Sequence, residues 1–216
     1  MNVEAARTQM VNQQVRAWDV LDPAVLAVLT QVPREVFVPA RFRKLAFADS
    51  PIPLGAGQEM LTPQVEGRLL QALAIRGTDR VLEVGTGSGF LTACLARLAS
   101  RVLSLEILPE LADAARRNLR SVATWNAEVR TGDVFDYRPA EPWDVIAVTG
   151  SLPQPDDRFR EWLATGGRLF QVVGEAPLMR AQRVTRSADD QWTTTTLFET
   201  SLPPLIHATP ASKFRF

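Results

Sequence analysis

Apolar residues in the first fifty positions recur mostly at helical spacing. The run Ala24–Leu29 follows Asp22, whose side chain can accept hydrogen bonds from the free N–H groups of a helix start, and Pro23, which suits the first helical position. The proline-containing stretch 32–39 then breaks and redirects the chain. This pattern predicts a largely helical N-terminal segment.

A different pattern occupies residues 48–57, where two prolines and two glycines forbid a regular helix. We expect a shaped loop or an extended segment here, and such segments often carry function. Thr62 and Pro63 then repeat the combination of cap and proline before apolar residues at helical spacing up to Leu73, with Gly67 as a weak point. A helix is therefore predicted to lead into the next part of the chain.

Between residues 81 and 173, short apolar runs alternate with helical patterns. Parallel strands need crossover connections, which helices usually supply, so this alternation predicts a mostly parallel sheet with helices on both faces. The predicted strands are Val81–Val84, Val102–Leu105, Glu128–Thr131, Asp144–Thr149 and Arg168–Val173, and the predicted helices are Leu91–Leu98, Leu111–Leu119 and Phe159–Leu163.

The alternation of strand and helix patterns ends after Gly174. Two β-rich runs, Arg180–Arg186 and Trp192–Thr200, flank a polar stretch and predict a hairpin at one edge of the sheet. The tail Pro203–Phe216 has no assignable pattern. We expect one α/β domain over residues 1–216 with a doubly wound sheet; its parts are a helical and loop region (1–61), a core (62–175), and the edge hairpin with the tail (176–216).

A glycine cluster stands where the first strand of this core meets its helix. Gly85, Gly87 and Gly89 give the spacing G-x-G-x-G. Glycine permits positive φ angles and a close approach of a ligand to the main chain, and the free N–H groups of the next helix face that ligand. Phe90 occupies the place of the last glycine in the dinucleotide fingerprint, which favours a smaller nucleoside ligand over NAD.

Acidic residues follow the next two strands. Glu106 lies about 20 residues beyond the glycines, where a carboxylate can accept hydrogen bonds from ribose hydroxyls. Asp133 follows the third strand, although a turn-forming aspartate would also suit this place. Because ligands bind at the carboxyl ends of strands in open α/β sheets, these positions together favour S-adenosylmethionine. Glu83 is expected either near the cationic methionine end of that cofactor or as a carboxylate that braces the loop.

Composition and charge narrow the function further. The 24 basic and 24 acidic side chains cancel, so no general binder of nucleic acid or anionic membranes is indicated. Neither a secretory signal nor a run of about 18 apolar residues is visible, which leads us to expect a cytoplasmic protein without a membrane span. Cys94, the one cysteine, lies in an apolar helical pattern and is expected to be a packed small hydrophobe rather than a nucleophile.

Other kinds of chemistry lack the necessary residues. No cluster has the spacing of a zinc site, so no metal is expected, and neither a P-loop nor a G-x-S-x-G motif supports an NTPase or a hydrolase. His207, the only histidine, lies in the tail and is expected to be a surface or packing residue rather than a catalyst.

Several motifs beyond the glycine cluster match a known family. The most specific are Pro33-Arg34-Glu35 and Pro53–Gln58, whereas the glycine motif alone would fit any class I methyltransferase. Further matching segments are Met10-Val11, Asp22–Leu26, Phe37-Val38-Pro39, Ala46–Pro51, Val148-Thr149, Gly166–Leu169 and Val173-Gly174. Over roughly residues 10–175, the chain resembles the protein-L-isoaspartate O-methyltransferases.

The resemblance implies a seven-stranded class I methyltransferase fold, with S-adenosylmethionine as methyl donor. It also implies, as substrate, the carboxylate of isoaspartyl residues in damaged proteins or peptides, and hence a role in protein repair. Separately, we expect a monomer or homodimer. The residues expected to bind the cofactor are Gln58, Glu83, Gly85, Thr86, Gly87, Ser88, Gly89, Glu106, Ile107, Asp133, Val134 and Thr149, and the expected acceptor-site positions are Glu59, Leu61 and Thr62.

Two segments depart from the family pattern. Glu59-Met60-Leu61 stands where the family usually has Thr-Ile-Ser, whose hydroxyls help to hold the substrate carboxylate, and Gly132-Asp133-Val134 replaces Gly-Asp-Gly. Methyl transfer to a carboxylate depends on positioning, and the loss of one oriented donor typically costs ~10²- to 10³-fold in rate. A Glu59 carboxylate ~5 Å from the substrate carboxylate would add a repulsion of about 3 kcal/mol at an effective dielectric constant of ~20.

Two hypotheses therefore stay open at this point. The chain is an active methyltransferase that acts on isoaspartyl protein, or on an amine, guanidine or hydroxyl acceptor that Glu59 would favour, including a small molecule. Alternatively, it is a non-catalytic module that binds S-adenosylmethionine or a protein partner. If Glu59 points to solvent and Thr62 supplies the missing hydroxyl, the conflict disappears, although Thr62 is better explained as a helix cap.

Overall fold

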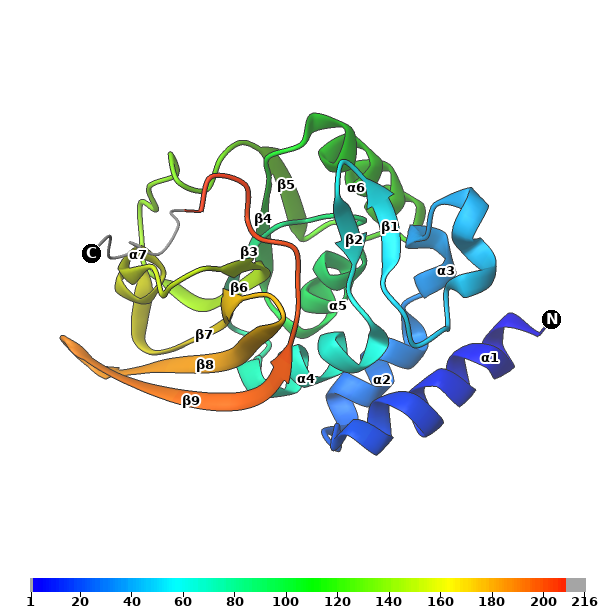
Figure 1. Cartoon of the computed structure of the whole chain (residues 1–216), viewed down its shortest axis with the longest axis horizontal. Helices are drawn as coiled ribbons and strands as arrows, with labels where there is room; N and C mark the ends of the chain where they lie inside the picture. Colours follow the sequence, from blue (N-terminus) through cyan, green and yellow to red (C-terminus); the bar gives the residue numbers. More distant parts are fainter. Residues whose placement is uncertain (1, 209–216) are drawn as a thin grey trace.

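The computed structural model describes residues 2–208 and centres on a seven-stranded sheet of order β5-β4-β3-β6-β7-β8-β9 (Figure 1). Strands β5, β4, β3, β6 and β7 pair in parallel, whereas β8 pairs antiparallel with both β7 and the edge strand β9, which confirms the predicted fold class and edge hairpin. Residues 209–216 of the unassigned tail lie outside the described range. The strands are β3 (Arg80–Val84), β4 (Arg101–Glu106), β5 (Ala127–Thr131), β6 (Trp143–Leu152), β7 (Leu163–Glu175), β8 (Leu178–Ala188) and β9 (Gln191–Thr200).

Helices flank the sheet and build the N-terminal region. Asp22 caps its helix as predicted, accepting a hydrogen bond from the backbone N–H of Ala24 at 2.8 Å. No helix in the described part of the chain is long and apolar enough to cross a membrane. The helices are α1 (Val3–Met10), which runs on through a π-helical turn (Val11–Val15) and a 3-10 turn (Arg16–Trp18), α2 (Pro23–Gln31), α3 (Arg34–Phe37), a 3-10 turn (Ala40–Leu45), α4 (Pro63–Leu73), α5 (Phe90–Leu98), α6 (Pro109–Ser121) and α7 (Asp157–Glu161).

Alternation along the central strands divides the core between the two faces of the sheet. Val81 of β3 packs with the apolar side chains of α2, α4 and α5, whereas its neighbours Leu82 and Val84 pack on the opposite face with Phe159 of α7. Glu83 therefore shares the face of Val81 and points toward the larger helical layer. Glu83 is therefore turned away from the face on which Leu82 and Val84 lie.

Two elements differ from the sequence expectations. The extended segment expected at residues 48–57 pairs with residues that follow it: β1 (Ile52–Gly55) and β2 (Gln58–Met60) form a separate antiparallel hairpin. Leu163, predicted as a helix end, instead begins β7, because it pairs with Trp143 of β6. An apolar residue at the end of an element fits both the helical period of 3.6 residues and the strand period of two. Only its pairing partner shows which element it belongs to.

Gly67, a weak point in a helix by propensity, has a packing reason in α4. A Cβ atom there would lie 2.8 Å from Cγ1 of Val15 and 3.1 Å from Cγ2 of Val20. The glycine lets the N-terminal segment lie directly on α4.

The chain after β9 returns across the carboxyl ends of the strands, and we call residues 201–208 the strap. Its main anchor is Ser151 of β6, whose N–H donates to the carbonyl of Pro203 at 2.9 Å and whose carbonyl accepts from Leu205 at 2.9 Å. The hydroxyl of Ser151 donates to the carbonyl of Leu202 at 3.0 Å. Figure 1 shows this red segment running from β9 over the middle of the sheet.

A fully buried guanidinium, that of Arg34 in α3, ties the N-terminal region to the core. Its Nε donates to the carbonyl of Ala46 at 2.9 Å, its Nη2 donates to the carbonyl of Leu61 at 2.6 Å, and its Nη1 forms an ion pair with Glu66 of α4. Its Cζ also lies 4.7 Å from the centre of the Phe90 ring. Burial raises the pKa of Glu66, and the guanidinium opposes that rise.

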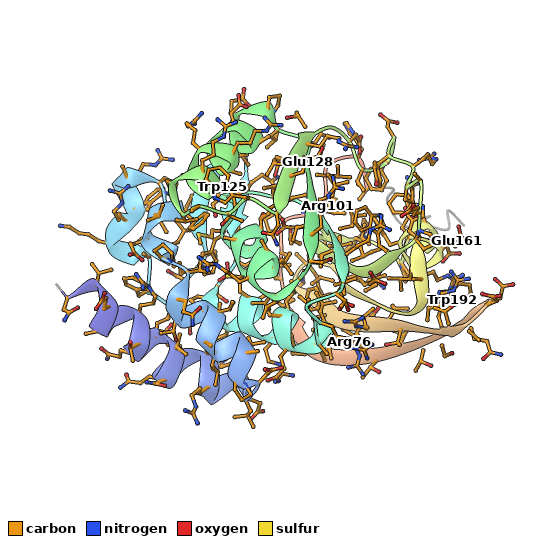
Figure 2. The ribbon with its side chains drawn as sticks, turned by 180° about the vertical axis from the view of Figure 1, so that it is seen from behind. Arg76, Arg101, Trp125, Glu128, Glu161 and Trp192 are labelled. Carbon is orange, nitrogen blue, oxygen red and sulfur yellow. The ribbon has the colours of Figure 1, made fainter. Side chains whose placement is uncertain are left out.

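We expect Arg34→Met to lower the free energy of unfolding by about 3 to 5 kcal/mol, because it leaves a buried carboxyl and two buried carbonyls without their donor. Urea unfolding followed by circular dichroism measures the change. The matched control is Arg101→Met, which removes the exposed ion pair with Glu128 on the outer strands (Figure 2) and should cost less than about 1 kcal/mol. Equal losses in the two variants would contradict the anchoring role of Arg34.

Candidate functional site

A cavity of about 700 Å³, counted out to its open mouth, lies at the carboxyl ends of β3, β4, β5 and β6. This is the point of the sheet where ligands bind in open α/β folds. We call it the cofactor cavity. Its lining comes from the glycine loop, the ends of the strands, the β1–β2 hairpin and the strap: Leu54, Gln58, Glu59, Leu61, Val84, Gly85, Gly87, Leu105, Glu106, Ile107, Leu111, Gly132, Asp133, Val134, Thr149, Gly150, Pro203, Leu205 and Ile206.

The glycine loop after β3 needs two of its glycines for different reasons. Gly85 has φ +93°, and a Cβ there would lie 2.4 Å from Oγ1 of Thr149, which donates to the carbonyls of Val84 and Gly85 at 2.9 and 2.7 Å. Gly87 has φ +54°, and a Cβ there would meet Leu54 of the β1–β2 hairpin at 3.2 Å. The loop is thus packed between β6 and the hairpin.

Glu106 at the end of β4 braces that loop while it faces the cavity. Its Oε2 accepts from the N–H of Gly87 at 2.8 Å, and its Oε1 accepts from the N–H of Leu108 at 3.1 Å. Only 5 % of the residue is exposed. Each carboxylate oxygen can accept a second hydrogen bond, so Glu106 can also receive the hydroxyl groups of a ribose.

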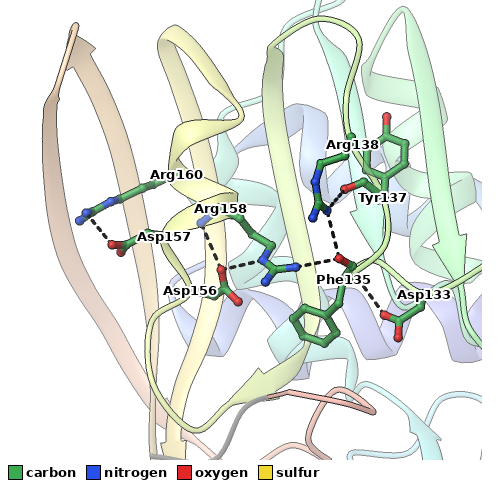
Figure 3. Close-up of polar contacts among 8 residues, drawn as sticks. All are labelled: Asp133, Phe135, Tyr137, Arg138, Asp156, Asp157, Arg158 and Arg160. Atoms are coloured by element: carbon green, nitrogen blue, oxygen red, sulfur yellow. Dashed lines mark hydrogen bonds and ion pairs between the residues drawn. The ribbon is translucent and has the colours of Figure 1, made fainter.

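Asp133 after β5 makes two contacts that hold the far wall of the cavity. Its Oδ1 accepts from the N–H of Phe135 at 2.8 Å, and the Phe135 carbonyl accepts from Arg138 and Arg158, both at 3.0 Å (Figure 3). Its Oδ2 lies 2.7 Å from Nδ1 of His207 in the strap. Asp133 therefore combines the two roles considered for it, since it shapes a turn and also lines the cavity.

The strap covers one side of the cofactor cavity. Pro203, Leu205 and Ile206 line it, and Leu205 packs so closely on Gly150 that a Cβ there would lie 2.7 Å from Cδ2 of Leu205. His207, two thirds exposed, is a surface residue as expected, but it also closes the contact with Asp133. The sequence pattern of the tail contained no signal for this placement.

Glu83 and Gly89, both predicted to bind the cofactor, line neither the cofactor cavity nor the smaller chamber beside it. Glu83 is fully buried on the helical face of β3, where Oε2 accepts from the hydroxyls of Thr92 and Ser104, both at 2.5 Å. Burial raises the pKa of Glu83 to about 8, and the residue does not line the cavity because the strand alternation turns it away. Gly89 begins α5 at φ +86° and packs against Ala115 of α6, where a Cβ would lie 3.1 Å from the alanine Cβ.

A smaller chamber adjoins the cofactor cavity beneath the glycine loop, and we call it the inner chamber. The predicted residues Thr86 and Ser88 line it, together with the buried carboxyl of Glu66. The hydroxyl of Thr86 lies 2.5 Å from that of Ser104, which also contacts Glu83. Polar, buried groups at this end suit the charged end of an amino-acid ligand.

The expected acceptor segment lies where the cavities meet. Glu59 and Leu61 line the cofactor cavity, the inner chamber and a third depression, which we call the outer groove. Thr62 lines the outer groove only, and although it occupies the N-cap position of α4, its hydroxyl makes no capping hydrogen bond. The outer groove is lined by Trp18, Asp49, Pro51, Glu59, Leu61, Thr62, Val65, Glu199, Thr200, Ser201 and Leu202.

Arg34 is the functional residue that motif spacing did not reveal. It belongs to the motif Pro33-Arg34-Glu35, but its contact with the carbonyl of Leu61 holds the backbone at the meeting point of the three cavities. Its partner Glu66 is 32 positions away along the chain, and no local pattern links the two. Arg34 therefore acts on the site as a positioning residue.

The donor set fits S-adenosylmethionine. Glu106 can accept the ribose hydroxyls, the apolar side chains of Ile107, Leu111 and Val134 can pack on a base, and Asp133 can accept from an amino group. The inner chamber supplies buried polar groups for the methionine end. Glu59 and Leu61 line both the cofactor cavity and the outer groove, so a second reactant that lies in the groove can be next to the cofactor.

Comparisons with known proteins agree with this site. Residues 5–209 match the family model "Protein-L-isoaspartate(D-aspartate) O-methyltransferase (PCMT)". Protein-L-isoaspartate O-methyltransferase 1 of Rhodopseudomonas palustris is 40 % identical over 204 residues, 94 % of this chain and 83 % of that protein. Protein-L-isoaspartate O-methyltransferase of Methanoculleus marisnigri is 42 % identical over 169 residues, 78 % of this chain and 77 % of that protein.

A solved structure shares the fold. It comes from Plasmodium falciparum and is described as a protein-L-isoaspartate O-methyltransferase in complex with S-adenosyl-L-homocysteine. The TM-score is 0.81 at 18 % sequence identity, with 92 % of this chain and 97 % of that chain covered. On the match of the family model and the identity to its curated members, this chain belongs to the protein-L-isoaspartate(D-aspartate) O-methyltransferase family.

Proposed function

We propose that this protein transfers the methyl group of S-adenosylmethionine to the carboxylate of isoaspartyl residues in proteins or peptides. The observation that carries the proposal is the outer groove, which meets the cofactor cavity at Glu59 and Leu61. A nucleoside ligand can occupy the cavity while a peptide lies in the groove. The curated relatives are named for this substrate, which supports the choice of acceptor.

S-adenosylmethionine supplies an activated methyl group on a sulfonium sulfur. The protein contributes binding and orientation: Glu106 accepts from the sugar, and the glycine loop gives the ligand access to the main chain. The acceptor carboxylate is already ionised near neutral pH, so no strong base is required. Rate then depends on holding one carboxylate oxygen in line with the methyl group and on excluding water from the cavity.

The substrate assignment is tested with two peptides that differ only in one residue, isoaspartate or aspartate. We expect the isoaspartyl peptide to be the better acceptor by about 10²-fold or more, because a displacement of the reacting oxygen by about 1 Å can cost that much. The rate of S-adenosylhomocysteine formation measures transfer. Equal rates for the two peptides, or transfer to neither, would exclude the proposed acceptor.

The cofactor site is tested at Gly85. Gly85→Ala should weaken S-adenosylhomocysteine binding by at least about tenfold, because the new Cβ is strained at φ +93° and overlaps the Thr149 hydroxyl. Calorimetric titration measures the affinity. The matched control is Gly77→Ala, whose Cβ would meet nothing within 4 Å and which should bind normally. Unchanged affinity in Gly85→Ala would place the ligand elsewhere.

The strap is tested at His207. We expect His207→Ala to weaken S-adenosylhomocysteine binding by up to about fivefold, a modest effect because the imidazole is two thirds exposed and exposed pairs contribute little. His207→Gln, which keeps a hydrogen-bond donor, should restore part of the affinity. The same titration reports both variants, and tighter binding by His207→Ala would show that the strap hinders the cofactor.

A further inference from the structure

Among the ionisable residues of the described range, Glu59 alone lines all three cavities of the site. It is in the middle of β2, paired with Pro53 of β1, and is flanked by the buried Met60. Glu59 and Leu61 are the two residues that line the cofactor cavity, the inner chamber and the outer groove together. A methyl acceptor that lies in the groove at this end is therefore next to Glu59.

The charges around Glu59 are almost all negative. Glu66 faces it in the inner chamber and is paired with Arg34, which lies behind that chamber. No Lys or Arg side chain within residues 2–208 lines any of the three cavities. The other charged groups that share a cavity with Glu59 are Asp49 and Glu199 in the outer groove and Glu106 and Asp133 in the cofactor cavity.

These negative charges bear on the protonation state that Glu59 can have when an acidic acceptor is bound. The sulfonium of the cofactor carries one positive charge, which the arriving isoaspartyl carboxylate balances. An ionised Glu59 would then be an uncompensated negative charge next to the acceptor, and like charges in one site cannot both stay ionised cheaply. A neutral carboxyl group, by contrast, has one O–H that can be donated to the acceptor.

The environment shifts the protonation equilibrium of Glu59 toward the neutral form. Burial raises the pKa of Glu59 above its ordinary value, since the charged carboxylate loses contact with water.

Resting on the proposed function, we propose that Glu59 acts as a protonated carboxyl that donates a hydrogen bond to the isoaspartyl carboxylate and orients it toward the methyl group. One oxygen of the acceptor receives this hydrogen bond, and the other attacks the methyl carbon. The new C–O bond forms as the S–C bond breaks, and its electron pair remains on sulfur. The products are the methyl ester and S-adenosylhomocysteine, and Glu59 keeps its proton throughout.

The sign of the pH dependence follows from this role. Activity needs an ionised acceptor, whose ordinary pKa is about 4, and a protonated Glu59. It is therefore highest between these two pKa values and falls about tenfold per pH unit once the pH exceeds the raised pKa of Glu59. An amine acceptor would give the opposite trend, since amines become nucleophilic only as they lose a proton.

The experiment measures kcat/KM for an isoaspartyl peptide from pH 5 to pH 9 as S-adenosylhomocysteine formed. Glu59→Gln donates at every pH, so its profile should be flat above pH 6, and at pH 9 it should exceed the wild type by at least about tenfold. Glu59→Ala, which has no donor, should be about 10²- to 10³-fold slower than the wild type at the wild-type optimum. Glu199→Gln, which removes an acid from the groove alone, should retain the alkaline decline.

Titration of each variant with S-adenosylhomocysteine separates the possible failures. If the variants bind the ligand but none methylates the peptide at any pH, the proposed function is wrong, and this inference falls with it. If transfer occurs but the wild type is flat or rises with pH, or if Glu59→Gln is no faster than the wild type at pH 9, the inference alone is overturned. Transfer to a lysine-containing peptide that grows with pH would also overturn it.

Discussion

The buried guanidinium of Arg34 is the interaction on which the arrangement of the site depends. It contacts the 3-10 region through Ala46, the acceptor segment through Leu61 and the first turn of α4 through Glu66. A guanidinium enclosed in this way is costly to desolvate, and its stabilising value comes from having its donors matched to fixed acceptors. The helical N-terminal region is therefore held in one position relative to the glycine loop, and the cavities between them keep a defined shape.

The central strands β3 and β4 could be predicted from local patterns because they are short, largely apolar and buried. Strands β3 and β4 were placed to within one residue at either end, at Arg80–Val84 and Arg101–Glu106. Pairing across the sheet was harder to foresee. The start of β7 at Leu163 and the pairing of β2 with β1 depend on partners rather than on propensity.

In the site too, some residues could be predicted from local patterns, whereas others depend on contacts between distant parts of the chain. Gly85, Glu106 and Asp133 could be found because they follow consecutive strands whose carboxyl ends meet at one edge of a parallel sheet. Glu83 does not line the cavity, because one position along a strand reverses the direction of a side chain, and proximity in sequence to the glycines does not correct for that. The contact of His207 with Asp133 joins residues 74 positions apart, and the ion pair of Arg34 with Glu66 has no local signature either.

The strap also sets an order of events in folding. Residues 201–208 reach Ser151 only after the chain has passed outward through β7, β8 and β9 to the sheet edge, so their contacts close a loop of about 50 residues. Such long-range contacts form late, after the more local pairing of β3, β4 and β6. The glycine loop and Glu106 can thus be in place while one wall of the cavity is still missing. Competence to retain the ligand is acquired at the end of folding, when the last strand docks.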